Sequence, residues 1–205
     1  MLHLRVHPDN PQPRLISQAV ERIRAGDVIV YPTDAAYAIG CQIGNKAAME
    51  RIAQIRGLGP KHQYAILCCD LSDLATYAKV DNATYRLLKN NTPAVTTFIL
   101  NATSEVPRRL MHPKRKTIGL RIPSNTICQQ LLQELGEPLL TSTLILPNQE
   151  DPLDDPYDIE MQLGKRIDVF IDAGLGTLST TSIVDLSGDQ PVIVRQGVGD
   201  VSAFA

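Results

Sequence analysis

The chain has 205 residues, of which 43% are hydrophobic and 20% are charged, and its formal net charge is −2 at pH 7. This composition indicates a globular protein with a sizeable core and excludes a disordered chain, and the charge argues against a generally basic nucleic-acid-binding surface. No apolar run approaches the ~18 residues of a membrane span and no secretory signal is evident, so we expect a cytoplasmic protein.

The first half of the chain is predicted to alternate strands and helices. Alternation over residues 2–6 predicts an opening strand, and the helical spacing of apolar residues from Leu15 to Ile23 predicts a helix that Gly26 ends. The elements expected next are a strand over 28–31, a helix over 47–55, a strand over 64–69, and helices over 71–77 and 83–89.

The second half is predicted to be richer in strands. We expect strands over 95–100 and 117–122, a helix over 126–135, a strand over 139–146, one or two helical turns over 157–163, and strands over 169–171, 181–186 and 192–194. This order predicts an α/β fold in which helices flank a twisted, mixed, open sheet. Because no flexible linker or internal repeat interrupts it, we expect a single domain over residues 1–205.

Charged residues form two clusters. Five cations fall within nine residues, namely Arg108, Arg109, Lys114, Arg115 and Lys116. They predict either a phosphate-binding edge or a solvated loop beside a strand. Six acidic residues between Glu150 and Glu160 are interspersed with prolines, which indicates a solvated loop or a short lid.

Metal and disulfide chemistry are not expected. The four cysteines, at positions 41, 68, 69 and 128, include no C-x-x-C pair, which fits a reduced compartment. The four histidines, at positions 3, 7, 62 and 112, lack metal-ligand spacing, and we expect ordinary surface groups.

The ten residues YPTDAAYAIG, from Tyr31 to Gly40, are the most informative stretch. Pro32 cannot donate to a sheet ladder, so the preceding strand should end there. Thr33 and Asp34 would then lie at the C-terminal end of a strand, where α/β proteins commonly bind ligands. The alternative is a strand-ending turn in which Asp34 bonds its own backbone.

Familiar phosphate-binding loops are missing from the sequence. Neither G-x-x-x-x-G-K-[ST] nor G-x-G-x-x-G after a strand occurs. Bound phosphates would therefore be held by hydroxyls and guanidinium groups, for which Arg56, Arg121 and Arg195 are candidates at strand ends.

Several motifs resemble the YrdC family. GDVIVYPTDAAYAIGC (26–41) is similar to the family signature, and GLRIP (119–123), EPLLTST (137–143) and TTSIVDLSGDQPVIVRQGVGD (180–200) resemble its later motifs. The opening residues and KNNTPAVTTFIL (89–100) resemble the YciO branch in particular. The resemblance implies the YrdC-like α/β fold with a concave basic face.

The resemblance also implies an activity. Family members that act as threonylcarbamoyl-AMP synthases convert bicarbonate, L-threonine and ATP to threonylcarbamoyl-AMP, which is used in transfer RNA modification. ATP with magnesium and L-threonine are thus the implied substrates, with no tightly bound cofactor. Such chemistry needs positioned reactants and neutralised phosphates and no covalent nucleophile, so no catalytic residue is assigned.

The implied substrate- and nucleotide-binding residues are Thr33, Tyr37, Arg56, Thr97, Arg121, Ser142, Thr143 and Arg195. Thr33 would help to hold the amino acid, and Arg56, which matches the arginine of the family's K-x-R, would bind phosphate. Thr143 stands at the serine position of S-x-N.

Five departures from the family pattern argue against efficient ATP turnover. The lysine of K-x-R falls on Gln54, the asparagine of S-x-N on Ile145, the second threonine of Y-P-T-D-T on Ala35, and a common histidine on Leu67. The family's W-P-G-P-L segment becomes TPAVT (92–96) and loses its glycine. Each lost charged hydrogen bond would cost ~1.5–3 kcal/mol.

A nucleic acid partner is the other implication. Family members are described as binding double-stranded RNA, and the cations between Arg108 and Lys116 would contact its phosphates. With six Tyr, three Phe and no Trp, the chain has little for base stacking, which favours recognition of backbone and shape.

Three hypotheses therefore remain open. The protein is a diverged threonylcarbamoyl-AMP synthase, an RNA-binding or ribosome-related protein without synthase activity that binds double-stranded RNA, tRNA or rRNA, or a regulator that binds a nucleotide or metabolite without turnover.

Overall fold

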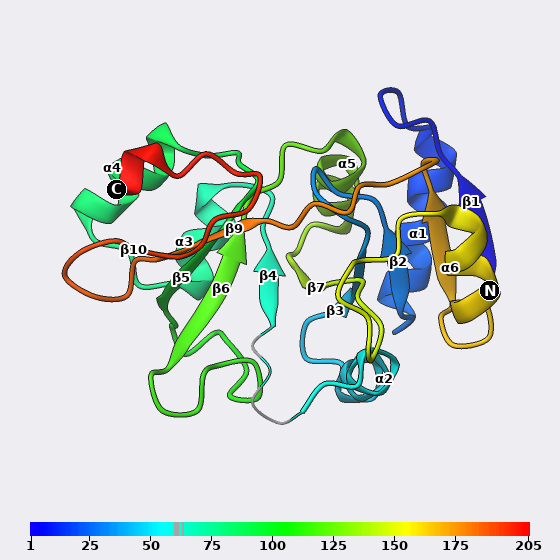
Figure 1. Ribbon diagram of the computed structural model, residues 1–205, viewed down its shortest axis with the longest axis horizontal. Coiled ribbons are helices and arrows are strands. Elements are labelled where there is room, and N and C mark those ends of the chain that lie inside the picture. Colours follow the sequence, from blue (N-terminus) through cyan, green and yellow to red (C-terminus); the bar gives the residue numbers. More distant parts are fainter. Residues whose placement is uncertain (60–61, 63) are drawn as a thin grey trace.

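A computed structural model describes residues 1–59, 62 and 64–205. In this part of the chain, ten strands form one continuous sheet and six α-helices pack around it (Figure 1). The strands are β1 (Leu2–Arg5), β2 (Ile29–Tyr31), β3 (Ala38–Gln42), β4 (Ala65–Leu67), β5 (Thr96–Asn101), β6 (Thr117–Arg121), β7 (Leu139–Thr143), β8 (Val169–Asp172), β9 (Ser182–Asp185) and β10 (Val192–Arg195). The helices are α1 (Pro13–Arg24), α2 (Lys46–Arg56), α3 (Leu71–Tyr77), α4 (Asn82–Asn90), α5 (Thr126–Leu135) and α6 (Pro156–Leu163), with a final 3-10 turn, η1 (Ser202–Phe204).

The sheet is mixed and open. Its strand order is β1-β8-β2-β3-β7-β4-β6-β5-β9-β10. Strand β8 runs parallel to β1 and β2, β4 to β6, and β5 to β9, whereas the other neighbours are antiparallel. The predicted α/β class with an open mixed sheet is confirmed, and the chain termini lie toward opposite ends of the molecule's long axis (Figure 1).

Strand β3 was not predicted. It pairs with β2 on one side and β7 on the other, so the signature residues between Tyr31 and Ala38 form the connection of a hairpin. Its small residues Ala38 and Gly40 have low β propensity, which explains the omission. Gly40 is required by packing, because a Cβ there would lie 2.5 Å from the Leu140 carbonyl oxygen and 3.1 Å from the Tyr31 ring.

Other element boundaries agree with the predictions to within a few residues. The largest difference is at β7, which was expected to reach residue 146 but ends at Thr143. One more bond in the same register, from Leu144 N–H to the Tyr37 carbonyl oxygen, follows Thr143, and the chain then turns because Ile145 N–H bonds the Thr143 carbonyl oxygen at 2.9 Å.

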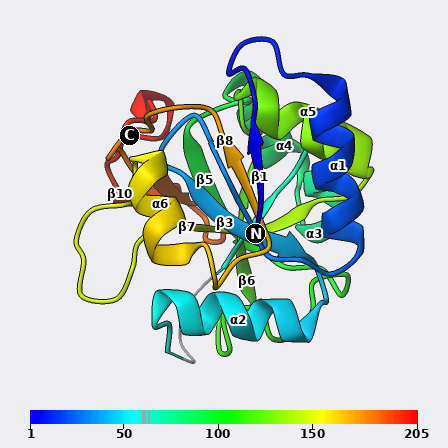
Figure 2. The same ribbon diagram turned by 90° about the vertical axis from the view of Figure 1, so that its right-hand side faces the viewer.

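Each face of the sheet has its own apolar cluster. Alternation along β2 sends Ile29 and Tyr31 into a cluster with α1 and α5, and Val30 into a cluster with α2, α3, α4 and α6. Figure 2 shows α1 and α5 on one side of the strands and α6 on the other. Helix α1 packs through Ile16, Ala19, Val20 and Ile23, which recur at helical spacing.

Helices α1 and α5 cover only part of the sheet face on which they pack. Phe98 and Leu120 point into the opposite cluster, so alternation turns Thr97 and Arg121 to the uncovered face. This region carries small and polar side chains, and the candidate site lies there.

Two further observations concern the helices and the thiols. No helix in the described residues has the length and apolar character needed to cross a bilayer. All four cysteines are free, and Cys41, Cys68 and Cys128 are buried.

Candidate substrate cleft

A cleft of about 60 Å³ opens on the uncovered face of the sheet. It is lined by Thr33, Ala35, Ala36, Ala38, Ala65, Thr97, Arg121, Thr141, Ser142, Thr143, Ser179, Thr180 and Thr181. Five of the eight predicted site residues are among them: Thr33, Thr97, Arg121, Ser142 and Thr143. Residues far apart in the sequence therefore share one small, hydroxyl-rich hollow.

Thr33 builds the turn between β2 and β3. Its hydroxyl donates to the Ala36 carbonyl oxygen at 2.7 Å and accepts from Ala35 N–H at 2.9 Å. The bond to Ala36 occupies the only hydrogen that this hydroxyl can donate, and its remaining lone pair can accept from a ligand.

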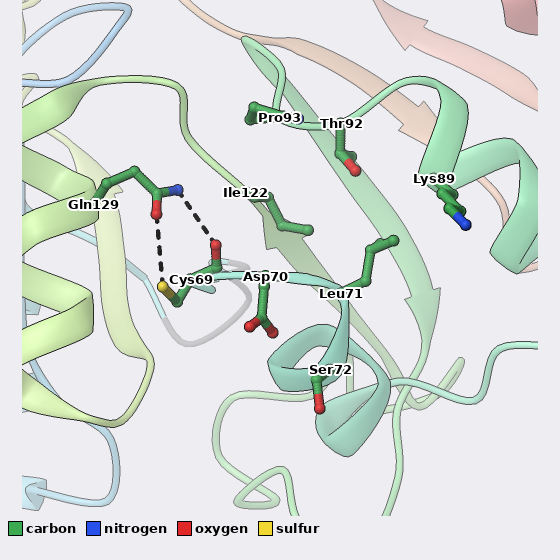
Figure 3. A pocket seen from close by; sticks show the side chains of 9 residues that line it. All are labelled: Cys69, Asp70, Leu71, Ser72, Lys89, Thr92, Pro93, Ile122 and Gln129. Atoms are coloured by element: carbon green, nitrogen blue, oxygen red, sulfur yellow. Dashed lines mark hydrogen bonds between the residues drawn. The ribbon is translucent and has the colours of Figure 1, made fainter.

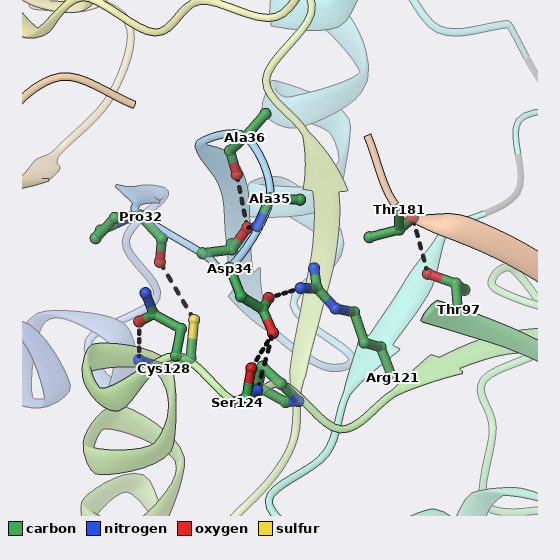
Figure 4. Close-up of polar contacts among 12 residues, drawn as sticks. Pro32, Asp34, Ala35, Ala36, Thr97, Arg121, Ser124, Cys128 and Thr181 are labelled. Atoms are coloured by element: carbon green, nitrogen blue, oxygen red, sulfur yellow. Dashed lines mark hydrogen bonds and ion pairs between the residues drawn. The ribbon is translucent and has the colours of Figure 1, made fainter. Parts of the chain in front are cut away.

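Asp34 does not bond its own backbone, as the strand-ending turn would require. One carboxylate oxygen, Oδ1, is ion-paired with Arg121 Nη2, and Oδ2 accepts from Ser124 N–H at 2.9 Å and from Ser124 Oγ at 2.8 Å (Figure 4). The side chains of Asp34 and Arg121 are only 11% and 8% exposed. Desolvation lowers the pKa of Arg121, but a guanidinium stays charged in proteins. The positive charge of Arg121 is therefore neutralised inside the protein by the carboxylate of Asp34.

Arg56 approaches the cleft from the end of α2, where Gly57 adopts a left-handed φ of 63°. Arg56 Nη1 donates to Ser142 Oγ, and its Nε donates to the Ile145 carbonyl oxygen at 3.1 Å. Partial burial lowers the pKa of Arg56, and none of the described carboxylates forms an ion pair with it.

His62 is not the ordinary surface group that was expected. Its Nε2 lies 3.4 Å from Ser142 Oγ, and its ring packs edge-on to Tyr64 at a centroid distance of 5.0 Å. Burial and then the charge of Arg56 lower the pKa of His62 to about 4, so the imidazole is neutral at pH 7. Nothing in the sequence around His62 signals this position, because its contact with Ser142 on β7 spans 80 positions.

Arg195 reaches the other side of the cleft from β10. Its Nε and Nη2 donate to the Thr181 carbonyl oxygen at 2.9 and 2.7 Å, and Nη2 also donates to Thr181 Oγ1 at 3.1 Å. Thr181 Oγ1 lies 3.3 Å from Thr97 Oγ1, which continues the polar chain onto β5 (Figure 4).

A β-bulge sets the direction of Arg195. Val192 pairs with Asp185 but Arg195 pairs with Ile183, so β10 holds one extra residue between these pairs. Residues three apart in a regular strand point to opposite faces, and the bulge returns Arg195 to the face of Val192, where the cleft lies.

Tyr37 is separated from the cleft by the turn. Its hydroxyl donates to the Gly174 carbonyl oxygen at 2.7 Å and accepts from Ala173 N–H at 3.1 Å. Burial raises its pKa to about 12. It lines a neighbouring pocket of about 140 Å³ that shares Thr33 with the cleft.

A wider pocket of about 600 Å³ lies at the other side of the β6 terminus, between α3, α4 and α5 (Figure 3). Cys69, Leu71, Pro93, Ile122 and Gln129 line it, with Asp70, Ser72, Lys89 and Thr92. None of the predicted site residues takes part.

The basic segment forms the loop between β5 and β6, at the end of β6 opposite Arg121. Arg115 pairs with Asp185, and Arg109 lies 3.9 Å from Glu50. Within the described part of the chain, Arg108, Lys114 and Lys116 are exposed and form no ion pair.

Thr181 and Ser124 were not predicted as site residues. Thr180 and Thr181 directly precede β9 within the motif of residues 180–200. Two adjacent hydroxyls at the start of a strand could therefore have indicated Thr181 as a site residue. Ser124 offers no comparable signal, because its contact with Asp34 spans 90 positions. No cluster of three or more His, Cys, Asp or Glu side chains suited to a metal occurs among residues 1–59, 62 and 64–205.

The sequence and the fold match a known family. The family model Sua5/YciO/YrdC, described as "Telomere recombination", matches residues 21–197. The chain therefore belongs to the Sua5/YciO/YrdC family, which confirms the resemblance found in its motifs.

Particular relatives refine this assignment. YciO of Escherichia coli (strain K12) is 55% identical over 199 residues, which cover 97% of each protein. The crystal structure of E. coli YciO has a TM-score of 0.95 and 54% identity, with 100% of both chains covered. The predicted similarity to the YciO branch is thus confirmed.

More distant relatives include proteins with a named activity. The threonylcarbamoyl-AMP synthase of Halorhodospira halophila is 25% identical over 191 residues, 93% of this chain and 94% of that protein. P. abyssi Sua5 complexed with L-threonine has a TM-score of 0.87 at 21% identity, covering 96% of this chain and 58% of that one, which shows a shared fold.

Proposed function

We propose that the protein is a diverged threonylcarbamoyl-AMP synthase, in which the cleft of about 60 Å³ holds the anionic groups of an adenosine nucleotide and L-threonine while the rest of both ligands lies outside it. The observation that carries this proposal is the pair of guanidinium groups at one cleft. Arg56 bonds Ser142 and Arg195 bonds Thr181, both residues line the cleft, and neither arginine is paired with a described carboxylate. Carboxylate and phosphate are the groups that guanidinium donors bind best.

The relatives support the same chemistry. A threonylcarbamoyl-AMP synthase aligns over 93% of this chain, and the fold is shared with a Sua5 protein complexed with L-threonine. The reaction joins a carboxylated amino acid to a nucleotide phosphate without a covalent enzyme intermediate, so a cleft of hydroxyls and cations is sufficient to position the reactants.

A reduced rate is part of the proposal. Gln54 is neutral and exposed, and Ile145 contributes only its carbonyl oxygen to Arg56. Compared with the family pattern, the chain has one cation and one amide fewer to stabilise charge that moves to the leaving diphosphate.

The test is product formation from L-threonine, bicarbonate and ATP with magnesium, measured as diphosphate release and as threonylcarbamoyl-AMP. Arg56→Ala and Arg195→Ala should each lower the rate by about 10-fold or more, because each removes a charged hydrogen bond. Arg14→Ala, which changes an exposed arginine of α1, is the matched control. If the wild-type protein makes no more product than a protein-free mixture, the synthase proposal is wrong.

A second candidate function is double-stranded RNA binding through the β5–β6 loop. Arg108, Lys114 and Lys116 are exposed and lack ion pairs in the described structure, so their charges are free for phosphates. Replacing all three by Gln should weaken binding and lower the slope of log K against log salt by up to about 3. Unchanged affinity in this variant would rule the loop out as the binding surface.

A further inference from the structure

Two neighbouring parallel strands send the chain to opposite faces of the sheet. Strand β4 continues into α3, whose Leu74 packs in the cluster with α2, α4 and α6, and β6 continues into α5, whose Leu131 packs in the cluster with α1. A crevice forms outside the carboxyl ends of such strands, and open α/β sheets commonly bind ligands there.

The pocket of about 600 Å³ lies at this crevice (Figure 3). Cys69 and Asp70 reach it from the end of β4, and Ile122 reaches it from the end of β6. Its volume is in the range of sites for drug-sized ligands, ~300–1,000 Å³. Among the described residues, none lines both this pocket and the cleft, so the two are separate sites.

Polar side chains in the wall are held in place before a ligand arrives. Gln129 Nε2 donates to the carbonyl oxygens of Pro123 and Cys69, at 2.7 and 3.3 Å, and so fixes α5 to the ends of both strands. Asp70 Oδ1 accepts from Asp73 N–H at 2.9 Å, which leaves Oδ2 for a ligand. A pocket whose walls are already fixed loses little conformational freedom on binding.

Two charges at the rim of the pocket lack a partner. Among residues 1–59, 62 and 64–205, neither Asp70 nor Lys89 forms an ion pair. Figure 3 shows Lys89 on α4 and Asp70 before α3, with Leu71 between them. Leu71, Pro93 and Ile122 give the pocket an apolar lining.

We propose that this pocket binds a short peptide with apolar side chains and free ends. The ammonium group of the peptide faces Asp70, its carboxylate faces Lys89, and its side chains lie on the apolar lining. A free amino acid carries both charges on one carbon atom, whereas Asp70 and Lys89 belong to different elements and are separated by Leu71. In an extended peptide each residue moves the two ends ~3.3–3.6 Å further apart, so two or three residues suit such a separated pair. Because the pocket is separate from the cleft, the proposal does not depend on synthase activity.

The experiment is calorimetric titration of the full chain with the dipeptide Leu-Leu, with its N-acetylated form and with its C-terminal amide. We expect Leu-Leu to bind with a dissociation constant in the millimolar range or below. Each capped form should bind about 3- to 10-fold more weakly, because it loses one of two ion pairs with exposed partners.

Two variants test the assignment of each end. Lys89→Gln should weaken Leu-Leu binding about 3- to 10-fold and leave binding of the amide unchanged. Asp70→Asn should weaken Leu-Leu binding by a similar factor and leave binding of the N-acetylated form unchanged. Both variants should fold, because Lys89 is exposed and asparagine can cap α3 as aspartate does. Arg86→Gln, which removes an exposed cation of α4 outside the pocket, is the matched control.

Several outcomes would contradict the inference. Absence of Leu-Leu binding in the millimolar range, or binding that neither Lys89→Gln nor Asp70→Asn weakens, would overturn the proposed site. N-acetylated Leu-Leu that binds as tightly as Leu-Leu would show that the amine is not recognised, and the site would then suit the carboxyl end of a protein chain instead of a free peptide. Equal weakening by Arg86→Gln and Lys89→Gln would indicate a general effect of charge and no contact with Lys89.

Discussion

Arg121 lies at its predicted position in the cleft, and its charge is already paired within the protein. The motif placed it among the nucleotide ligands, and it does line the cleft. Its charge is nevertheless directed at Asp34, which is held in turn by Ser124. This ion pair joins the β2–β3 turn to the end of β6 and so fixes the floor of the cleft.

Breaking the ion pair should be costly. Asp34→Ala leaves Arg121 buried and unpaired, and we expect a loss of about 3–5 kcal/mol in the free energy of unfolding, measured in denaturant. Ser124→Ala is the control and should cost about 1 kcal/mol, because it removes one hydrogen bond to the same carboxylate. A loss below about 1 kcal/mol for Asp34→Ala would show that the pair contributes little.

His62 makes stability depend on pH. Burial lowers its folded-state pKa to about 4, below the unfolded value of about 6.5, so the unfolded chain binds the proton more readily. Its contribution is therefore complete above pH ~6.5 and is lost as the pH falls toward 4, with a slope of at most about 1.4 kcal/mol per pH unit, less because the ring is partly exposed.

The comparison of wild type with His62→Asn at pH 7 and pH 4.5 tests this contribution. The wild type should lose more stability over this range than the variant, which cannot take up the proton. Equal losses in the two proteins would mean that the imidazole is not desolvated in the folded state.

At the scale of elements, the C-terminal segment depends on close backbone contacts. Ser182 is fully buried, and its hydroxyl accepts from Gly197 N–H at 2.9 Å and donates to the Gly199 carbonyl oxygen at 2.7 Å. A Cβ on Gly199 would lie 2.3 Å from both the Val95 carbonyl oxygen and Thr96 Oγ1. The segment after the β10 bulge can therefore pack on β5 and β9 only with glycine at this position.

Gly199→Ala should destabilise the protein by about 1–3 kcal/mol, because the added methyl group forces the backbone away from β5. Gly188→Ala is a suitable control, since a Cβ there meets no atom within 4 Å. Similar unfolding midpoints for the two variants would contradict the close packing inferred for Gly199.

At the scale of the whole molecule, the two apolar clusters share the same strands. Tyr37 belongs to the cluster under α2 and α6, and Tyr31 to the cluster under α1 and α5, with β2 and β3 between them. Because both clusters pack on the same strands, unfolding of these strands would expose both clusters to water. That the chain forms a single domain stays a prediction, and this arrangement favours it.

Chemical denaturation tests the prediction of one domain. Far-ultraviolet circular dichroism and tyrosine fluorescence should follow the same transition with the same midpoint, because the strands and both clusters would unfold together. Two separated midpoints would indicate two units that unfold independently.

Much of this fold could be predicted from the sequence because local patterns carry it. Helical spacing identified α1, which begins at Pro13 and ends before Gly26. Apolar runs identified β2 and β8, because a strand that is buried on both faces consists mainly of apolar residues. The motifs also identified Thr33, Arg121 and Thr143, which do share one cleft.

Tertiary structure alone decided the partners within that cleft. The pairing of Asp34 with Arg121, the approach of His62 to Ser142, and the bulge that turns Arg195 inward depend on strand order and register. The contact between His62 and Ser142, for example, joins residues 80 positions apart, so no local pattern encodes it. The sequence determined which chemical groups are present, and the sheet determined which of their charges remain available to a ligand.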